Sequence, residues 1–491
     1  MSIPSIAQTL LDEARRLGVY VIVREQVKKA LQVVAQNGRI ETIDCAHSGG
    51  VGFQVHSADG HAAFGYADGF DEAEALATLR ATAASAARAA GLGASPDFAI
   101  RAAAPLQLHL PDPLCDAFDA IPLEALSART LEAHEEIRAL SPEIKLNTDV
   151  SAEREDWRVC RSDGTDTSWS VPRFVLRHGL TAAGASGTTT VRTHLFSPDY
   201  AALASAKDRR LVLARSRDAL RKVLGLRNAD RYPSGSYPLL IDYALAKGLA
   251  HEAFGHAAEA DSFRSSVLAR DGRFRSGERV GRDDVSVIDE PLKGDHAYQP
   301  ISANGLVRER VEIVRRGVLH EALADLYSAG PGGVPVKGAE RAESYKSTPI
   351  PRMSNIRIEL TLSNPLPRPF EEMSPEDVRD LVGQAGLFDR FPKIVFLSGY
   401  TGGQVNPVLG DFVFNCQALY ELTPRGATLY RPAIFRGSLL AALASISRAF
   451  GPLQLDAIGT CGKWNQHVPS SGGSHGYVFI EPNESVGVGG R

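Results

Sequence analysis

The sequence has few features that would suggest a membrane or an oxidising compartment. Its longest apolar run, GSLLAALASIS, is far shorter than the roughly 20 residues that span a bilayer. The N-terminal stretch MSIPSIAQTLLDEARRLG carries acidic residues and lacks the apolar core of a signal peptide. The five cysteines are widely scattered, which does not resemble a disulfide framework. We therefore expect a cytoplasmic protein with no membrane partner.

The sequence also lacks a large excess of positive or of negative charge. The chain has 54 Lys and Arg residues against 58 Asp and Glu residues, which gives a formal net charge of −4. Bulk electrostatics therefore give no reason to expect a nucleic-acid partner. Hydrophobic residues make up 44% of the chain and charged residues 23%, which is ordinary for a globular protein. A length of 491 residues suggests about two to four domains.

The order of the periodic segments predicts an α+β fold. Residues 5–17 have the apolar spacing of a helix, and residues 18–43 and 49–68 alternate like strands joined by Gly/Asp turns. The Pro-containing stretch APLQLHLPDP, residues 104–113, is interpreted as a linker.

We expect three parts along the chain. Residues 1–105 form an N-terminal α/β subdomain, and residues 106–232 form a central subdomain of helices and a sheet. Residues 233–491 form a β-rich, largely antiparallel C-terminal domain. That last part carries one helix of unusual composition near its start, LAHEAFGHAAEAD.

The run LAHEAFGHAAEAD is close to the zinc-peptidase pattern H-E-x-x-H, but its second histidine comes one residue late. His251 and His256 are five residues apart, so a regular α-helix would point their rings about 140° apart. A π-type turn would bring both rings to one side, and such turns are rare and often found at functional sites. Gly255 tolerates this distortion. The spacing therefore permits a metal site only if the helix is irregular here, and the alternative is a chance pattern on a regular helix.

Further candidate ligands follow from the chemistry of zinc. A catalytic zinc ion commonly has three protein ligands and one open position. Cys461, in a Gly-rich turn, is the foremost candidate for the third ligand, and His467 and His475 are weaker ones. Glu259 and Asp261 either orient the imidazoles by hydrogen bonds or form a solvated acidic helix end.

Several stretches, in this order along the chain, resemble the TldD/PmbA family of metalloproteases, also called modulators of DNA gyrase. HEAFGHAAEAD is similar to the H-E-x-x-x-H motif of that family. RAESYKSTPIPRMSN, GYTGGQVNPVLGDFVFNCQALYEL and CGKWNQHVP are similar to three further family segments. The resemblance is strong in the C-terminal half and general in the N-terminal half.

The resemblance implies a role for each matching residue. His251, His256 and Cys461 would bind a Zn²⁺ ion, and Glu252 would be the general base that activates water. This ligand set is that of the metal-bearing, TldD-like type. The family implies a dimer, formed with itself or with a metal-free PmbA-like relative, and small or unfolded peptides as substrates.

Other functions stay open at this stage. PSSGGSHGYVF follows the Cys461 segment where the family usually reads P-V-G-x-G-Q-P, so the substrate is open. A pathway-specific amide hydrolase of secondary metabolism would use the same chemistry, and a non-hydrolytic partner-binding module is a further alternative. Arg341, Tyr345 and Arg352 either contact a peptide or form a structural network, and we favour the network.

Overall fold

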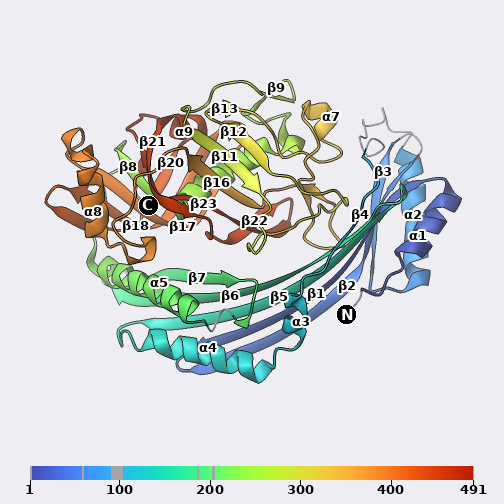
Figure 1. Ribbon diagram of the computed structural model, residues 1–491, viewed down its shortest axis with the longest axis horizontal. Coiled ribbons are helices and arrows are strands. Elements are labelled where there is room, and N and C mark those ends of the chain that lie inside the picture. Colours follow the sequence, from blue (N-terminus) through green and yellow to red (C-terminus); the bar gives the residue numbers. More distant parts are fainter. Residues whose placement is uncertain (1–2, 58–59, 90–102, 185–186, 202–204, 490–491) are drawn as a thin grey trace.

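A computed structural model describes residues 3–57, 60–89, 103–184, 187–201 and 205–489. The first half of the chain is built on one long, curved sheet with helices at both ends (Figure 1). Its elements are α1 (Ala7–Leu17), β1 (Tyr20–Gln36), β2 (Arg39–His56), β3 (Ala62–Asp68), α2 (Glu72–Ala89), β4 (Gln107–Leu110), α3 (Leu114–Asp119), α4 (Leu123–Arg138), β5 (Lys145–Arg161), β6 (Asp166–Gly184), β7 (Gly187–Ser197) and α5 (Ala206–Gly225).

The strand order of this sheet is β3-β2-β1-β5-β6-β4, with β7 paired to β6. Asn37 and Gly38 join β1 to β2 with positive φ angles of 52° and 77°, as a tight hairpin turn requires. β1 pairs with β5 along most of its length, so strands from the first two predicted parts share this sheet. The division of the chain into three parts stays a prediction.

The predicted linker 104–113 is wrong in one respect, because it contains strand β4. Gln107–Leu110 pairs in parallel with β6. Leu108 and Leu110 alternate with polar residues and pack beside a buried cluster that includes Trp157 and Trp169. The two flanking prolines suggested a loop, but proline is compatible with the ends of an edge strand.

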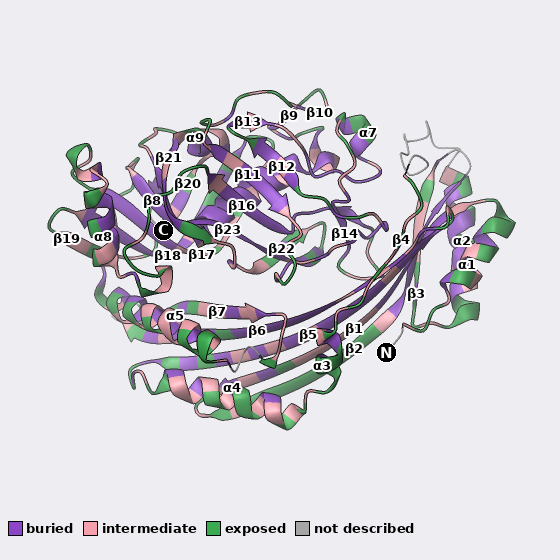
Figure 2. Ribbon diagram, in the orientation of Figure 1, coloured by how far each residue is buried: buried purple, intermediate pink, exposed green. Residues whose placement is uncertain are grey.

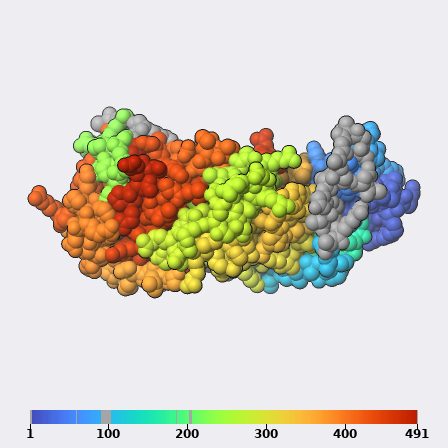
Figure 3. All heavy atoms as spheres, turned by 90° about the horizontal axis from the view of Figure 1, so that it is seen from above, coloured from blue at the N-terminus to red at the C-terminus, as the bar shows by residue number. Residues whose placement is uncertain are grey.

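The second half is a separate layer over the concave side of the long sheet (Figure 1). Seen from above, the C-terminal residues cover most of the molecule and the blue N-terminal helices lie at one end (Figure 3). Its strands are β8 (Leu239–Asp242), β9 (Ala269–Arg270), β10 (Arg273–Phe274), β11 (Val285–Glu290), β12 (Val311–Arg315), β13 (Val318–Leu319), β14 (Glu340–Arg341), β15 (Ile350–Pro351), β16 (Asn355–Leu360), β17 (Ile394–Asn406), β18 (Asp411–Thr423), β19 (Gly426–Tyr430), β20 (Ile434–Ser438), β21 (Ile446–Gln454), β22 (Gly459–Lys463), β23 (Gln466–Ile480) and β24 (Val486–Gly489).

The helices of this half are few and short. They are α6 (Tyr243–Gly248), α7 (Ala329–Gly332), α8 (Pro375–Gln384) and α9 (Leu439–Ser445), with the short helical segments η5 (Leu249–Gly255), η6 (His256–Ala258) and η7 (Ala260–Ser262) directly after α6. Single 3₁₀ turns, η4 (Leu226–Asn228), η8 (Phe370–Glu372) and η9 (Leu387–Asp389), complete the helices of the described residues. None of these helices is long and apolar enough to cross a membrane.

The main C-terminal sheet has the order β13-β12-β11-β16-β23-β8-β17-β18-β20-β24. Its pairs are antiparallel except for β16 with β23 and β8 with β17. The α+β prediction is therefore confirmed.

β8 leads the chain from the centre of this sheet into the site. It lies between β17 and β23, and Leu239, Leu240 and Ile241 are fully buried. Asp242 then caps α6 by accepting a 3.0 Å hydrogen bond from the backbone N–H of Leu245. The strands here are almost entirely buried (Figure 2), so the residues after α6 enter a protected environment.

Candidate metal centre

The helix after β8 is irregular where the spacing of the histidines predicts it. Leu249–Gly255 forms a π-helix, and His256–Ala258 continues as a 3₁₀ turn. Because a π-turn has about five residues between hydrogen-bonded groups, it brings residues five apart to one side. The ring centroids of His251 and His256 are 5.1 Å apart. The prediction of an irregular helix is confirmed.

Gly255 is needed here because a larger side chain would not fit, and not because its backbone adopts a conformation that only glycine tolerates. Its φ of −57° and ψ of −61° are ordinary helical values. A side-chain carbon at this position would overlap Sδ of Met353 and lie 2.9 Å from its Cγ. Met353 is fully buried and crosses the helix directly at this point. The expectation that Gly255 accommodates a distorted backbone is therefore wrong in its reason, because the residue is required by the close approach of Met353.

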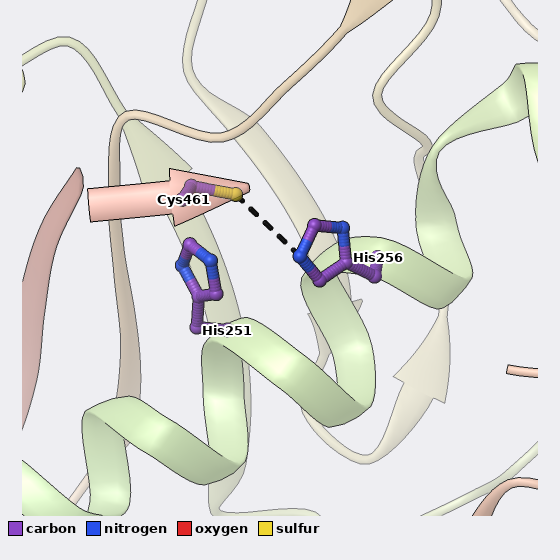
Figure 4. Close-up of side chains that lie close together, drawn as sticks. All are labelled: His251, His256 and Cys461. Carbon is purple, nitrogen blue, oxygen red and sulfur yellow. Dashed lines mark hydrogen bonds between the residues drawn. The ribbon is translucent and has the colours of Figure 1, made fainter. Parts of the chain in front are cut away.

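The three predicted ligands meet at one point. One ligand atom from each of His251, His256 and Cys461 lies within 4.8 Å of the other two. Figure 4 shows Cys461 reaching from β22 toward the two imidazoles on the helical segment. Cys461 Sγ and His256 Nε2 are 3.5 Å apart. Zn–S and Zn–N bonds of about 2.3 and 2.0 Å at a tetrahedral angle place the two atoms about 3.5 Å apart.

The surroundings of these side chains also fit a metal ion. His251 is 2% exposed, and no described residue hydrogen-bonds to its Nδ1. Two imidazoles and one thiol are the donors that zinc prefers. The residues present therefore fit a zinc ion.

The electrostatics of the site favour the thiolate form of Cys461. Burial raises the pKa of this thiol, but the neighbouring His256 and Arg352 outweigh burial and bring the pKa below its usual value. Burial likewise disfavours the charged form of His256, yet Glu259 and Cys461 hold the pKa of His256 well above its usual value. Burial and the positive charge of Lys247 lower the pKa of His251 well below its usual value, so that ring is neutral. Thiolate and neutral imidazole are the forms that bind metals, so Cys461 and His251 are in the binding form, whereas a metal ion would have to displace the proton of His256.

A buried carboxylate orients His256, and a lysine forms an ion pair with that carboxylate. His256 Nδ1 donates a 3.0 Å hydrogen bond to Glu259 Oε2, as expected for an orienting carboxylate. Glu259 is 1% exposed, and Lys463 lies 2.8 Å from it and 2.8 Å from Asp261. Asp261 therefore pairs with Lys463 and not with an imidazole, which corrects half of our expectation for these two acids.

Glu252 lies beside the three ligand atoms without belonging to their group. Its Oε1 accepts a 3.1 Å hydrogen bond from the hydroxyl of Tyr400, and its Oε2 is 3.9 Å from His256 Nε2. Its side chain is 18% exposed, so the carboxylate retains access to solvent and substrate. Tyr400 lies in the segment GYTGGQ, where its neighbours suggested a strand and gave no sign of this contact.

The two weaker histidine candidates lie outside the cluster. His475 hydrogen-bonds with its Nδ1 to the backbone oxygen of Gly451, and its Nε2 lies 3.1 Å from the backbone oxygen of Leu360. His467 is exposed on the hairpin of β22 and β23.

The three residues of uncertain role contact the protein itself. Arg341 donates to the backbone oxygens of Met353 and Pro469, and Arg352 donates to the backbone oxygen of Cys461. The hydroxyl of Tyr345 hydrogen-bonds to Asp68 on β3. These contacts are those of a network that joins the two halves of the chain and supports Cys461.

A cavity of about 760 Å³ opens from the metal centre toward the long N-terminal sheet. Glu252, His251 and His256 line one end, and Arg177 and His194, from β6 and β7, line the other. Its volume is in the range of sites that hold small molecules or short peptides. A cavity with both polar and apolar lining, beside three candidate metal ligands and a carboxylate, is compatible with a metal-dependent hydrolase.

Comparison with known proteins agrees with this class. Residues 21–90 match the family model described as PmbA/TldA metallopeptidase domain 1, and residues 234–462 match that of the PmbA/TldA metallopeptidase C-terminal domain. The chain belongs to the TldD/PmbA family of metallopeptidases, which confirms the resemblance seen in the sequence.

Curated relatives of this chain carry the name metalloprotease, and some of them are named as TldD homologs. A metalloprotease of Archaeoglobus fulgidus is 34% identical over 250 residues, which cover 50% of this chain and 52% of the relative. A zinc metalloprotease TldD homolog of Saccharolobus solfataricus is 24% identical over 324 residues, covering 64% of each chain. The chain thus spans about half the length of the first relatives that it matches.

Two solved structures share the fold over nearly the whole chain. A putative modulator of a DNA gyrase from Thermotoga maritima has a TM-score of 0.74 at 15% identity, covering 98% of this chain and 99% of that one. TldE from Thermococcus kodakarensis has a TM-score of 0.75 at 12% identity, covering 99% of this chain and 100% of that one.

Proposed function

We propose that this protein is a zinc-dependent peptidase that hydrolyses small or unfolded peptides inside its cavity. The observation that carries the proposal is the meeting of His251, His256 and Cys461 beside Glu252 at one end of the cavity. The metalloprotease names of the relatives support the class of reaction. The cavity admits a flexible chain more readily than a folded protein.

The roles of the side chains follow from their positions. The two imidazoles and the Cys461 thiolate would hold the ion, which supplies Lewis acidity that polarises a carbonyl oxygen and acidifies water. Glu252 takes the proton of the attacking water on its carboxylate and passes it to the leaving amine. The hydroxyl of Tyr400 hydrogen-bonds to one Glu252 oxygen and so leaves the other oxygen free to face the substrate.

The Glu252→Gln variant tests this assignment. It keeps the size and the Tyr400 contact of the side chain but removes the base. General acid–base residues contribute about 10²- to 10⁴-fold in rate, so digestion of a peptide library should slow by at least about 100-fold while the zinc content stays unchanged. Glu371→Gln, at another place in the same cavity, is the matched control and should keep its activity. Cleavage by Glu252→Gln at the wild-type rate would exclude the proposed base.

The dimer is part of the same proposal, formed with itself or with a metal-free PmbA-like relative. A library experiment with and without such a partner also separates the alternatives. No cleavage by the zinc-loaded wild type, even with the partner added, would favour a pathway-specific amide hydrolase or a partner-binding module. Light scattering that gives a 52.7 kDa monomer at micromolar concentration would argue against self-association.

A further inference from the structure

Lys247 brings a buried positive charge close to the metal centre. It lies on α6, four residues before His251, which is about 6 Å along a helix. The residue is 4% exposed and lines the same cavity as His251 and Glu252. Nothing in the neighbouring sequence distinguishes this residue, because a lysine on a short helix is usually solvated.

The ammonium of Lys247 has no carboxylate partner among the described residues. It donates one hydrogen bond, of 3.1 Å, to Ser470 Oγ, and it lies 5.9 Å from the centre of the Tyr400 ring. An ammonium has three N–H donors, so two remain for another acceptor. Burial lowers the pKa of Lys247, while the negative charges of Cys461, Glu252 and Asp295 favour its charged form, but none of these three groups forms an ion pair with it.

Other cations that line the cavity are already neutralised. Three of them form ion pairs with carboxylates of this chain: Arg177 with Asp149 at 2.8 Å, Arg215 with Asp456 at 2.6 Å, and Lys222 with Asp218 at 2.7 Å. Arg192 has no such partner within the described residues, but it is exposed, so water solvates its charge. Lys247 thus differs from the other lining cations in being both buried and without a counter-ion.

A buried charge without a partner is unfavourable unless something else requires it. The unused donors of Lys247 and its place in the cavity wall indicate an anion that enters the cavity. One peptide residue spans about 3.3–3.6 Å. Lys247 Nζ lies 5.9 Å from the centre of the Tyr400 ring, and the hydroxyl of Tyr400 bonds to Glu252, so an anion bound at Lys247 would lie within a few residues of the bond that is cleaved.

We infer that Lys247 is a positioning residue that binds a carboxylate of the substrate, within a few residues of the scissile bond. This carboxylate is either the free C-terminus of a peptide or an acidic side chain. The inference rests on the proposed peptidase function and makes it more specific, since it predicts a preference for anionic peptides. Binding at Lys247 fixes the register of the peptide and so determines which carbonyl lies beside Glu252.

Binding measurements in the zinc-loaded Glu252→Gln protein test the inference without turnover. Acetylated hexa-alanine with a free C-terminus is compared with its C-terminal amide, and an amidated hexapeptide with one internal Glu is compared with its Gln counterpart. A charge-assisted hydrogen bond in a buried site is strong, so the carboxylate form of at least one pair should bind about tenfold more tightly or better. The pair that shows the preference identifies the source of the carboxylate.

Variants of Lys247 then assign the preference to this side chain. Lys247→Met and Lys247→Gln should each reduce the ratio of the affinities for the carboxylate peptide and its neutral counterpart to below about twofold. Lys247→Arg should retain most of this ratio. Lys393→Met is the matched control, since Lys393 also lies over a tyrosine ring, at 5.2 Å from that of Tyr237, but outside the cavity. This control should keep the full ratio. Thermal unfolding and zinc content verify that each variant is folded and loaded.

The outcomes separate this inference from the proposed function. Equal binding of carboxylate and neutral peptides by the protein with Lys247 intact overturns the inference, and so does a ratio that survives in Lys247→Met. If the wild type cleaves peptides with no preference between the members of either pair, the peptidase proposal stands and the inference falls. If nothing is cleaved but the ratio depends on Lys247, the binding site stands and the peptidase proposal falls.

Discussion

Replacement of Gly255 by alanine tests how Met353 packs against the π-helix. Alanine is the better helix former by about 0.5–1 kcal/mol, and the backbone of Gly255 is helical. Without a steric obstacle, Gly255→Ala would therefore stabilise the protein. The obstacle is Met353, because the new methyl group would overlap its sulfur atom in a fully buried environment.

The expected size of the effect follows from these two opposing contributions. Extra carbon atoms in a packed core typically cost about 1–3 kcal/mol. Subtracting the gain in helix propensity leaves Gly255→Ala less stable than the wild type by up to about 2.5 kcal/mol. The displaced Met353 would also push the helix at His256, so weaker zinc binding should accompany the loss of stability.

A double-mutant cycle with Met353→Ala isolates the contact. Met353→Ala alone should cost about 2–5 kcal/mol, because it leaves a cavity in the core. In that background the obstacle is gone, so Gly255→Ala should become neutral or stabilising by up to about 1 kcal/mol. Urea unfolding of the four proteins measures the cycle. A Gly255→Ala cost that is the same in both backgrounds would refute the packing argument.

Three further predictions concern the support of the site and the pH dependence of stability. Tyr400→Phe removes the hydrogen bond to Glu252 and should lower kcat about tenfold with unchanged zinc content; an unchanged kcat would show that the contact does not position the base. Glu259→Gln should weaken zinc binding about 10- to 100-fold in competition with a chelator, and an unaltered affinity would contradict its orienting role. Burial lowers the pKa of His178 to about 3, so the folded protein takes up this proton at a lower pH than the unfolded chain does. Stability should therefore be complete above about pH 6.5 and fall by about 1.4 kcal/mol per pH unit between pH 6.5 and 3. His178→Gln should make the measured slope shallower by that amount between pH 4 and 6, and an identical slope would exclude this cause.

Local spacing was enough to predict the irregular helix and two members of the cluster. His251 and His256, five residues apart, cannot share one face of a regular helix, so a π-turn is required if both rings are to bind one ion. Cys461 was found because a third ligand was required and its segment matched a family motif. These are properties of short stretches, which a sequence displays directly.

The contacts that complete the site depend on tertiary structure and left no local signal. Tyr400 on β17, Lys463 at the end of β22 and Lys247 on α6 come together only because β8, β17 and β23 are neighbours in one sheet. The strand β4 was missed for a similar reason, since a four-residue edge strand depends on its partner β6 more than on its own sequence.

The central claim is that Cys461 and the two histidines bind one zinc ion. The most direct measurement is the zinc content per chain of the purified wild type, of Cys461→Ala and of Cys416→Ala. Cys416 is also buried, but it hydrogen-bonds to the backbone oxygen of Ala433 and lies outside the cluster, so it is the matched control. We predict about one zinc ion per chain in the wild type and in Cys416→Ala, and a large loss in Cys461→Ala. Equal zinc in all three proteins would contradict the three-ligand centre.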